Sequence, residues 1–416
     1  MRTVIKNLRK IYTSEGFHPL RSNLLDTIKI YSDCDIEILN GYITRIEPAI
    51  EAADSDDVVD AEGGIALPGF IDAHTHPIYA GTREREFTER MRGKKYEKIL
   101  AEGGGINYNI ARTRAAGDDE LRTVFLSNAL RFARNGITAF EAKTGYDLGD
   151  GELRLLKILN DLKRTLRQDI RITFLGGHVL PKGENKKEFI DSVKTRIINV
   201  AGSGLADYFD VWAEHIAFTN EEAEAMIKTA SEAGLKVRIH ANELSDFLAV
   251  LLLREYDIAS IDHFDFFNDE QVELIVSKGT NVTLLPLTQF SLGTENYPDA
   301  RRLIDADVTL SLSCDFNPGT SYSANIQFLA QLALLKCGMR VNEILNALTI
   351  NPACSLEMQD LCGTLEIGKQ GDAVIMDLPN LESMFYSIAG NDVLYTVKKG
   401  NVIYRRDHDH QKLLKA

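Results

Sequence analysis

The sequence predicts an α/β fold: a closed (β/α)8 barrel of the TIM type, with a small β-sandwich domain built from both chain ends. Through the middle of the 416 residues, strand-like apolar runs alternate with longer amphipathic segments, which indicates a buried parallel sheet. Eight such runs are found, the strand number of a TIM barrel. Both ends of the chain carry shorter strands broken by glycine, which favours a separate β-rich unit.

The two ends of the chain have the same β-rich texture. Residues 27–50, TIKIYSDCDIEILNGYITRIEPAI, alternate apolar and polar side chains around Asn40-Gly41, a strong hairpin signal. Residues 364–377 and 393–404 are strand-like and interrupted by glycine. We therefore expect 1–65 and 364–416 to form one β-rich domain and 66–363 to form the barrel.

The barrel strands follow one another with helical stretches between them. One such stretch is 220–235, NEEAEAMIKTASEAGL, in which apolar residues recur at spacings close to three and four. An open, doubly wound sheet is the alternative, but a glycine-rich nucleotide turn after the first strand would favour it and none is present. The candidate strands are IALPGFIDAHTH, GITAFEAKTGYD, RITFLGGHVLP, YFDVWAEHIAF, KVRIHANE, ASIDHFD, NVTLLPLTQ and TLSLSCDFNPG.

Composition limits the partners and the compartment. The 61 acidic residues outnumber the 47 basic ones, for a net charge of −14, so nonspecific nucleic-acid binding is not expected. An anionic substrate would need a local cation in its pocket. The five cysteines have no CxxC spacing, which indicates a reducing compartment. No apolar run is long enough for a signal peptide or a membrane span, and we expect a cytoplasmic protein.

Histidines concentrate at the predicted strand ends. The chain has nine histidines, and six of them fall at the carboxyl ends of candidate strands, where the active sites of TIM barrels lie. Each alone is more often a hydrogen-bonded core or surface residue, so the inference depends on the whole set. The six are His74, His76, His178, His215, His240 and His263.

The pattern His-x-His predicts a metal site. Residues i and i+2 of a strand point to the same side, so His74 and His76 can reach one ion. His240 and Asp315 could complete a nitrogen and oxygen site that leaves a position for water, which suits catalytic Zn²⁺. Such an ion lowers the pKa of its water and makes hydroxide available as a nucleophile near neutral pH.

Two further residues suit the chemistry of that site. Glu243 follows His240 by three residues and is the candidate general acid and base; the alternative is a solvated loop carboxylate. His263 could orient the hydroxide or stabilise charge on the attacked oxygen.

Together these motifs resemble the amidohydrolase superfamily and, within it, the imidazolonepropionase family. The resemblance covers nearly the whole chain, and the glycine triplet with KTGY and DFNPGT is more specific than His-x-His. The motifs that carry it are LPGFIDAHTHPIYAGTRE, AEGGGI followed by TRAA, KTGY, FLGGHVLP, RIHANE, IDHFD and CDFNPGT.

The resemblance implies an activity and a cofactor. The family hydrolyses the ring C–N amide bond of 4-imidazolone-5-propanoate in histidine degradation, giving N-formimidoyl-L-glutamate, and uses one zinc or iron ion. His74, His76, His240 and Asp315 match its metal-ligand positions and Glu243 its acid/base position. A carbamylated Lys143 bridging two metals is the alternative, but two-metal relatives carry that lysine on the fourth strand. A homodimer is also implied.

The resemblance also implies substrate contacts. Arg83 matches the residue that binds the propanoate, and its planar fork can pair both carboxylate oxygens. It would supply the cation that an acidic protein needs for an anionic substrate. The remaining pocket residues implied are Tyr146 and His178 beside the imidazolone, Asn317, Gly319 and Thr320 after the eighth strand and, as a weaker candidate, Tyr96.

Two alternatives to this reaction remain at the level of sequence. A deaminase or other cyclic amidase could use the same hydroxide on a related ring, and the dependence of binding on Arg83 would separate these. A noncatalytic barrel used for binding is the third hypothesis. Complete ligands together with Glu243 disfavour it, and a protein without stoichiometric metal would support it.

Overall fold

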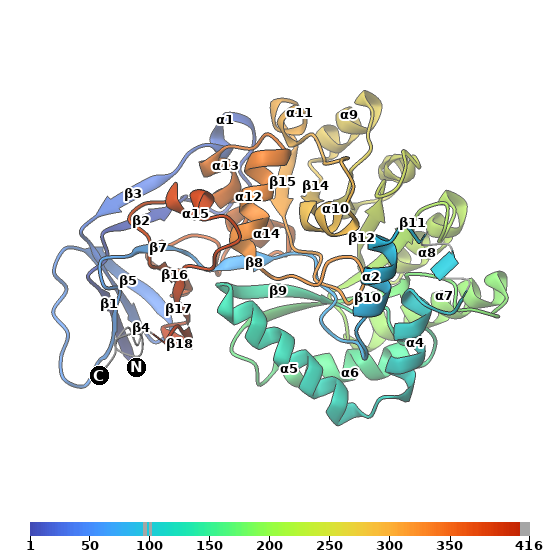
Figure 1. Ribbon diagram of the computed structural model, residues 1–416, viewed down its shortest axis with the longest axis horizontal. Helices are drawn as coiled ribbons and strands as arrows, with labels where there is room; N and C mark the ends of the chain where they lie inside the picture. The colour runs from blue at the N-terminus through green and yellow to red at the C-terminus, as the bar shows by residue number, and fades with distance from the viewer. Residues whose placement is uncertain (95–97, 100–101, 408–416) are drawn as a thin grey trace.

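The computed structural model describes residues 1–94, 98–99 and 102–407, and a barrel of eight parallel strands forms its centre (Figure 1). The strands lie side by side in chain order. The first and last are joined by a parallel bridge between Thr75 and Phe316 and by a hydrogen bond from His76 N to Phe316 O, 2.8 Å. This confirms the predicted TIM-type barrel. Its strands are β8 (Phe70–Asp72), β9 (Ile137–Lys143), β10 (Asp169–Gly177), β11 (Tyr208–Ala213), β12 (Lys236–Ala241), β13 (Ile258–His263), β14 (Asn281–Leu284) and β15 (Thr309–Leu312).

Helices alternate with these strands. The predicted helix over 220–235 is present, begins with a capping box between Thr219 and Glu222, and ends before Gly234, whose φ is 82°. The helices are α2 (Glu84–Met91), α4 (Ile106–Ala115), α5 (Asp118–Arg134), α6 (Gly151–Lys163), α7 (Lys186–Ser203), α8 (Asn220–Glu232), η1 (Ala249–Arg254), α9 (Asp269–Lys278), α10 (Pro286–Leu292), α11 (Ala300–Asp305), α12 (Ile326–Lys336), α13 (Val341–Ala347) and α14 (Ile350–Ser355).

The chain ends form two packed sheets beside the barrel (Figure 1). Buried side chains of both sheets, such as Ile38 and Ile375, share one apolar core, which confirms the predicted β-sandwich. One sheet has the order β5 (Tyr42–Glu47), β4 (Asp35–Leu39), β1 (Arg2–Lys6), β6 (Asp57–Asp60); the other has β18 (Asn401–Arg405), β17 (Val393–Lys398), β16 (Ala373–Met376), β7 (Ile65–Pro68), β2 (Lys10–Thr13), β3 (Lys29–Ser32). The short helices α1 (Ser22–Leu25) and α15 (Ser383–Tyr386) complete the fold. The domain boundaries at 65/66 and 363/364 stay a prediction.

The first predicted barrel strand is two strands. It breaks at Gly69: β7 pairs with β16 in the sandwich, and β8 pairs with β9 in the barrel. A Cβ at Gly69 would overlap the side chain of Thr138, so the chain crosses between the two units at a residue without a side chain. The strand also ends at Asp72, which places His74 and His76 just beyond it.

The seventh predicted strand and the segment 364–377 also contain less strand than expected. The seventh ends at Leu284, and Pro286 begins α10 because proline suits the first turn of a helix and cannot donate to a sheet. In 364–377 only β16 is a strand. The earlier part of that segment turns at Gly368, whose φ is 94°.

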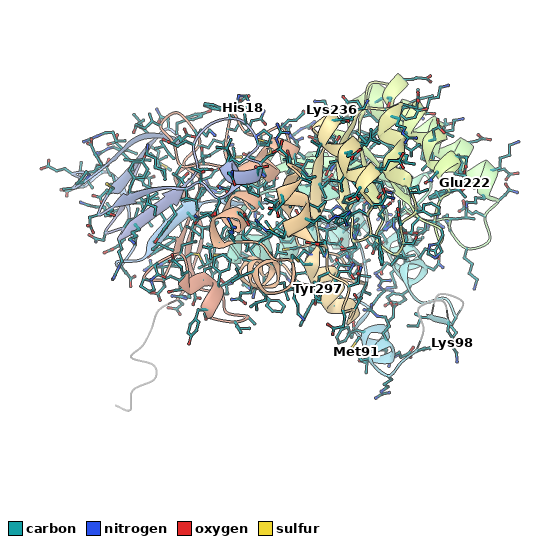
Figure 2. All side chains as sticks on the ribbon, turned by 90° about the horizontal axis from the view of Figure 1, so that it is seen from above. His18, Met91, Lys98, Glu222, Lys236 and Tyr297 are labelled. Carbon is teal, nitrogen blue, oxygen red and sulfur yellow. The ribbon has the colours of Figure 1, made fainter. Side chains whose placement is uncertain are left out.

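The carboxyl ends of the strands share one face of the barrel with α2. Figure 2 places Lys236, at the start of β12, and Met91, at the end of α2, on opposite sides of the barrel. Among the described residues, no helix is long and apolar enough to cross a membrane.

Candidate metal centre and active site

Three histidines and one aspartate meet at the carboxyl ends of the barrel strands. One ring nitrogen each of His74, His76 and His240 lies within 4.8 Å of the others. The Nε2 atoms of His74 and His76 are 3.3 Å apart. Asp315 Oδ1 is 3.6 Å from His74 Nε2 and 3.5 Å from His76 Nε2. All four side chains are buried, so the structure brings the four predicted ligands together.

The donor atoms of this cluster fit a divalent cation. Asp262 Oδ2 lies 2.7 Å from His74 Nδ1, and Asp210 Oδ2 lies 3.0 Å from His240 Nδ1. An imidazole that gives its Nδ1–H to a carboxylate keeps a lone pair on Nε2, and for His74 that is the atom facing His76. Nitrogen lone pairs and a carboxylate around one point are the donor set of zinc and related metals.

Asp315 is held in place for this arrangement. Thr288, on α10, donates its hydroxyl to Asp315 Oδ2 at 2.7 Å, which leaves Oδ1 facing the histidines. Burial alone would raise the pKa of Asp315, but the adjacent His76 and His74 hold it well below its usual range. Asp315 has φ 48° and His263 has φ 79°. Non-glycine residues in that region cost about 1–3 kcal/mol and concentrate at functional sites.

Glu243 and His263 lie next to this cluster and close to each other. Their Oε2 and Nε2 atoms are 3.7 Å apart. Burial raises the pKa of the Glu243 carboxyl well above its usual range, and the charges of Asp315 and Asp265 raise it further. Burial lowers the pKa of His263 to about 4, so its imidazole is neutral at neutral pH. Glu243 is a buried pocket carboxyl, and the alternative of a solvated loop residue is wrong.

A small pocket opens onto the cluster, with about 70 Å³ available to the centres of water-sized molecules. Its size suits a small molecule rather than a polymer. Tyr96, also predicted here, lies outside the described residues. The lining residues include most of the predicted substrate contacts and are His76, Arg83, Ile106, Tyr146, His178, Trp212, His240, Glu243, His263, Asp315, Asn317 and Thr320.

Arg83 brings positive charge to this pocket from the start of α2. Its Nη1 is buried without a hydrogen-bond partner within the described part of the chain and lies 3.7 Å from Glu86 Oε1. The guanidinium lies so close to Gly319 that a Cβ there would overlap it. Asn317 Oδ1 fixes this loop by accepting from Gly319 N at 2.8 Å and Thr320 N at 2.7 Å.

Aromatic rings form another wall of the pocket. The His178 ring stacks on that of His76, with centroids 5.6 Å apart, and the Tyr146 ring meets His178 edge-on at 5.7 Å. Gly145 O lies 3.1 Å from His178 Nδ1. This wall gives a flat ring a surface to lie against.

Trp212 and Thr288 are site residues that the sequence reasoning missed. Trp212 packs edge-on against His178 at 6.0 Å. Its indole Nε1 is buried with no partner of good hydrogen-bond geometry among the described residues, although its N–H acts to lower the pKa of nearby Glu243. The available signal was its position in the fourth candidate strand, two residues before the polar Glu214 at the carboxyl end of that strand, because alternate strand residues share a face. Thr288 was missed because residues 281–289 were predicted to form a strand, whereas Thr288 lies on α10.

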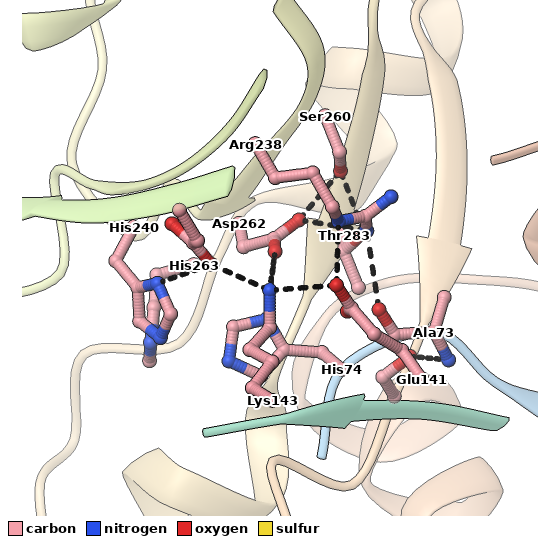
Figure 3. Close-up of polar contacts among 12 residues, drawn as sticks. Ala73, His74, Glu141, Lys143, Arg238, His240, Ser260, Asp262, His263 and Thr283 are labelled. Carbon is pink, nitrogen blue, oxygen red and sulfur yellow. Dashed lines mark hydrogen bonds and ion pairs between the residues drawn. The ribbon is translucent and has the colours of Figure 1, made fainter. Parts of the chain in front are cut away.

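Lys143 lies among carboxylates beneath the cluster (Figure 3). Its Nζ is 2.5 Å from Asp210, 3.1 Å from Glu141 and 3.3 Å from Asp262. It is therefore an ion-paired ammonium, and the alternative of a carbamylated metal bridge has no support in this geometry.

A (β/α)8 barrel that carries histidines and an aspartate at its strand ends defines a metal-dependent hydrolase. The model of the amidohydrolase family matches residues 65–403. The chain belongs to the amidohydrolase family.

Relatives across nearly the whole chain share one name. An imidazolonepropionase of Caldanaerobacter subterraneus subsp. tengcongensis is 37% identical over 403 residues, 96% of this chain and 97% of its own length. One of Bacillus velezensis is 33% identical over 410 residues, 97% of each chain. Among solved structures, N-isopropylammelide isopropylaminohydrolase of Burkholderia multivorans matches with a TM-score of 0.68 at 18% identity, covering 97% of this chain and 98% of its own, which shows the fold alone.

Proposed function

We propose that this chain hydrolyses the ring C–N amide bond of 4-imidazolone-5-propanoate, giving N-formimidoyl-L-glutamate. The proposal draws on full-length relatives named imidazolonepropionase. The observation that carries it is the buried guanidinium of Arg83 in the same small pocket as the histidine and aspartate cluster. That combination suits a small ring bearing a carboxylate.

His74, His76, His240 and Asp315 are the proposed ligands of one zinc or iron ion. Such an ion supplies Lewis acidity, which lowers the pKa of water and polarises a carbonyl. Asp262 pairs with Nδ1 of His74 and Asp210 lies 3.0 Å from Nδ1 of His240. Carboxylates on the Nδ1 side favour Nε2 as the metal-binding nitrogen of each ring.

Arg83 binds the propanoate and thereby orients the ring. A guanidinium pairs a carboxylate through two parallel hydrogen bonds, and the buried Nη1 is available for one of them. The ring then lies against His178 and Tyr146. Asn317 and Thr320 line the pocket from the loop that packs against Arg83, where they suit contacts to the substrate or product.

Glu243 moves the proton. Its carboxylate takes a proton from the attacking water, and its protonated form delivers that proton to the ring nitrogen that leaves. The raised pKa of Glu243 favours the protonated form needed for the second step. Neutral His263, close to Glu243, donates a hydrogen bond to the carbonyl oxygen as negative charge develops on it.

The test is to incubate the metal-loaded protein with the imidazolone propanoate and follow the loss of imidazolone absorbance. A panel of cyclic amides and aminopyrimidines is assayed in the same way as alternative substrates. We expect turnover of the imidazolone propanoate, and a loss of about 10²- to 10⁴-fold in Glu243→Gln at unchanged metal content. Faster release of ammonia from an aminopyrimidine would favour the deaminase alternative and reject this assignment.

A further inference from the structure

We propose that Lys143 is a positioning residue of the metal centre, an internal cation that fixes the carboxylates behind His74 and His240 and so sets how tightly the centre holds a divalent ion. The inference uses the ligand assignment proposed above. The role of Lys143 is additional to that assignment, because Lys143 is not among the residues that line the pocket.

Lys143 Nζ is the shared partner of three strands. Asp210 on β11 lies at 2.5 Å, Glu141 on β9 at 3.1 Å and Asp262 on β13 at 3.3 Å. Lys143 and all three carboxylates have side chains with no exposed surface. A buried ammonium surrounded in this way has little freedom to move.

Two of the three carboxylates connect Lys143 to the metal centre. Asp262 Oδ2 accepts from Lys143 Nζ and lies 2.7 Å from His74 Nδ1 (Figure 3). Asp210 Oδ2 also accepts from Lys143 Nζ and lies 3.0 Å from His240 Nδ1. A single ammonium therefore contacts the carboxylates that lie beside Nδ1 of two ligand histidines, one just beyond β8 and one on β12. Those carboxylates decide which ring nitrogen keeps the lone pair.

The other oxygen of Asp262 is also occupied, so this carboxylate cannot turn without losing partners. Ser260 donates to Oδ1 at 2.5 Å and Arg238 approaches it at 3.5 Å. Arg238 also donates to Ala73 O at 3.1 Å, in the residue before His74. The Asp262 carboxylate and the segment that carries His74 are thus tied to the same buried guanidinium.

The charges of this network favour a divalent ion above it. Three carboxylates face two cations, Lys143 and Arg238, which leaves one negative charge, and Asp315 adds a second beside the histidines. A doubly positive ion balances both. Buried charges without compensation are costly, so the network and the ion stabilise one another.

Lys143→Met tests this, since methionine keeps most of the side-chain volume and removes the charge. We expect the affinity for Zn²⁺, measured by competition with a chelator, to fall by about 10- to 100-fold. We also expect the visible absorption of the Co²⁺-loaded protein to change, because the histidines lose their fixed orientation. Neither readout requires the imidazolone reaction.

Lys398→Met is the matched control. Lys398, on β17 of the sandwich, has a buried ammonium 2.5 Å from Asp372 and 2.7 Å from Asp169, which begins β10 at the end of the barrel away from the metal centre. Its loss should lower stability without changing metal affinity or the Co²⁺ spectrum. If both variants lose metal affinity equally, the effect is general destabilisation and the positioning role is wrong.

The remaining outcomes separate the two proposals. A wild-type protein that binds no stoichiometric metal would reject the ligand assignment itself. A wild-type protein that binds metal, with Lys143→Met unchanged in affinity and spectrum, would overturn only the role of Lys143. If Lys143→Met does not fold, Lys143→Gln takes its place, since its amide has two N–H donors but no charge. We expect about a tenfold loss of affinity in that variant, and unchanged affinity overturns the inference.

Discussion

Gly319→Ala is expected to disable substrate binding without touching the metal ligands. A Cβ at this position would fall on Nη2 and Cζ of Arg83. Asn317 fixes the loop through the backbone N–H of residue 319, so the guanidinium is the group that must move. The added methyl group should therefore displace the guanidinium and remove its contact with the substrate carboxylate.

The size of the effect follows from the interaction that is lost. Hydrogen bonds to charged groups contribute about 1.5–3 kcal/mol, and each 1.36 kcal/mol is tenfold in rate. We expect kcat/KM for the imidazolone propanoate to fall by about 10- to 150-fold. Arg83→Ala should give a similar loss, and the double variant should be little worse than Arg83→Ala alone, because the second change removes nothing further.

Steady-state kinetics with metal analysis of each preparation provide the assay. Gly202→Ala, in α7 and with open space around its Cβ, is the control and should keep wild-type kinetics. The reasoning would be refuted by Gly319→Ala with an unchanged kcat/KM, or by additive losses in the double variant with Arg83→Ala.

Three further changes test the pocket and its support. Glu152 is buried and accepts from the backbone N–H groups of Gly145 and Asp147, on either side of Tyr146. Burial raises its pKa from 4.5 to about 7, so the free energy of unfolding should fall as pH rises between those values, by up to about 3 kcal/mol. Denaturant titrations from pH 5 to 8 should show a smaller fall of the unfolding free energy with pH in Glu152→Gln, and an equal fall contradicts the prediction. Thr288→Val removes the donor to Asp315 Oδ2 and should weaken Zn²⁺ binding by about tenfold or more in chelator competition, whereas unchanged affinity would mean that Asp315 needs no such support. Trp212→Phe keeps a ring and removes a buried N–H beside Glu243, so kcat/KM should fall by about 2- to 12-fold at constant metal content, and a wild-type value would exclude a role for the N–H.

The barrel could be predicted from the sequence because strand identity and strand order are local signals. Each apolar run is continuous and ends in polar residues, and the carboxyl ends of parallel strands must share one face. That rule alone brings His74, His240 and Asp315 near one another. The break at Gly69 was not visible, because it depends on the side chain of Thr138 in the neighbouring strand.

The support of the site was harder to predict for the same reason. Asp210, Glu141 and Lys143 occupy ordinary strand positions, and only the barrel cross-section brings them to one point. From the sequence, Glu141 and Lys143 are seen to share one strand and Asp210 to lie on another, but the distance between these side chains is not apparent. Thr288 was missed because a run containing Leu-Pro-Leu looks like a strand until Pro286 is recognised as the start of a helix.

The pairing of β7 with β16 joins residues near opposite ends of the chain. On the ribosome, β7 emerges about 300 residues before its partner, a wait of about 15–60 s at ordinary elongation speeds. During that time one edge of β7 has no neighbour, while β8 just beyond Gly69 can already enter the growing barrel. The nascent chain thus carries an open strand edge for most of its synthesis, and such an edge is a surface through which unfinished chains can associate.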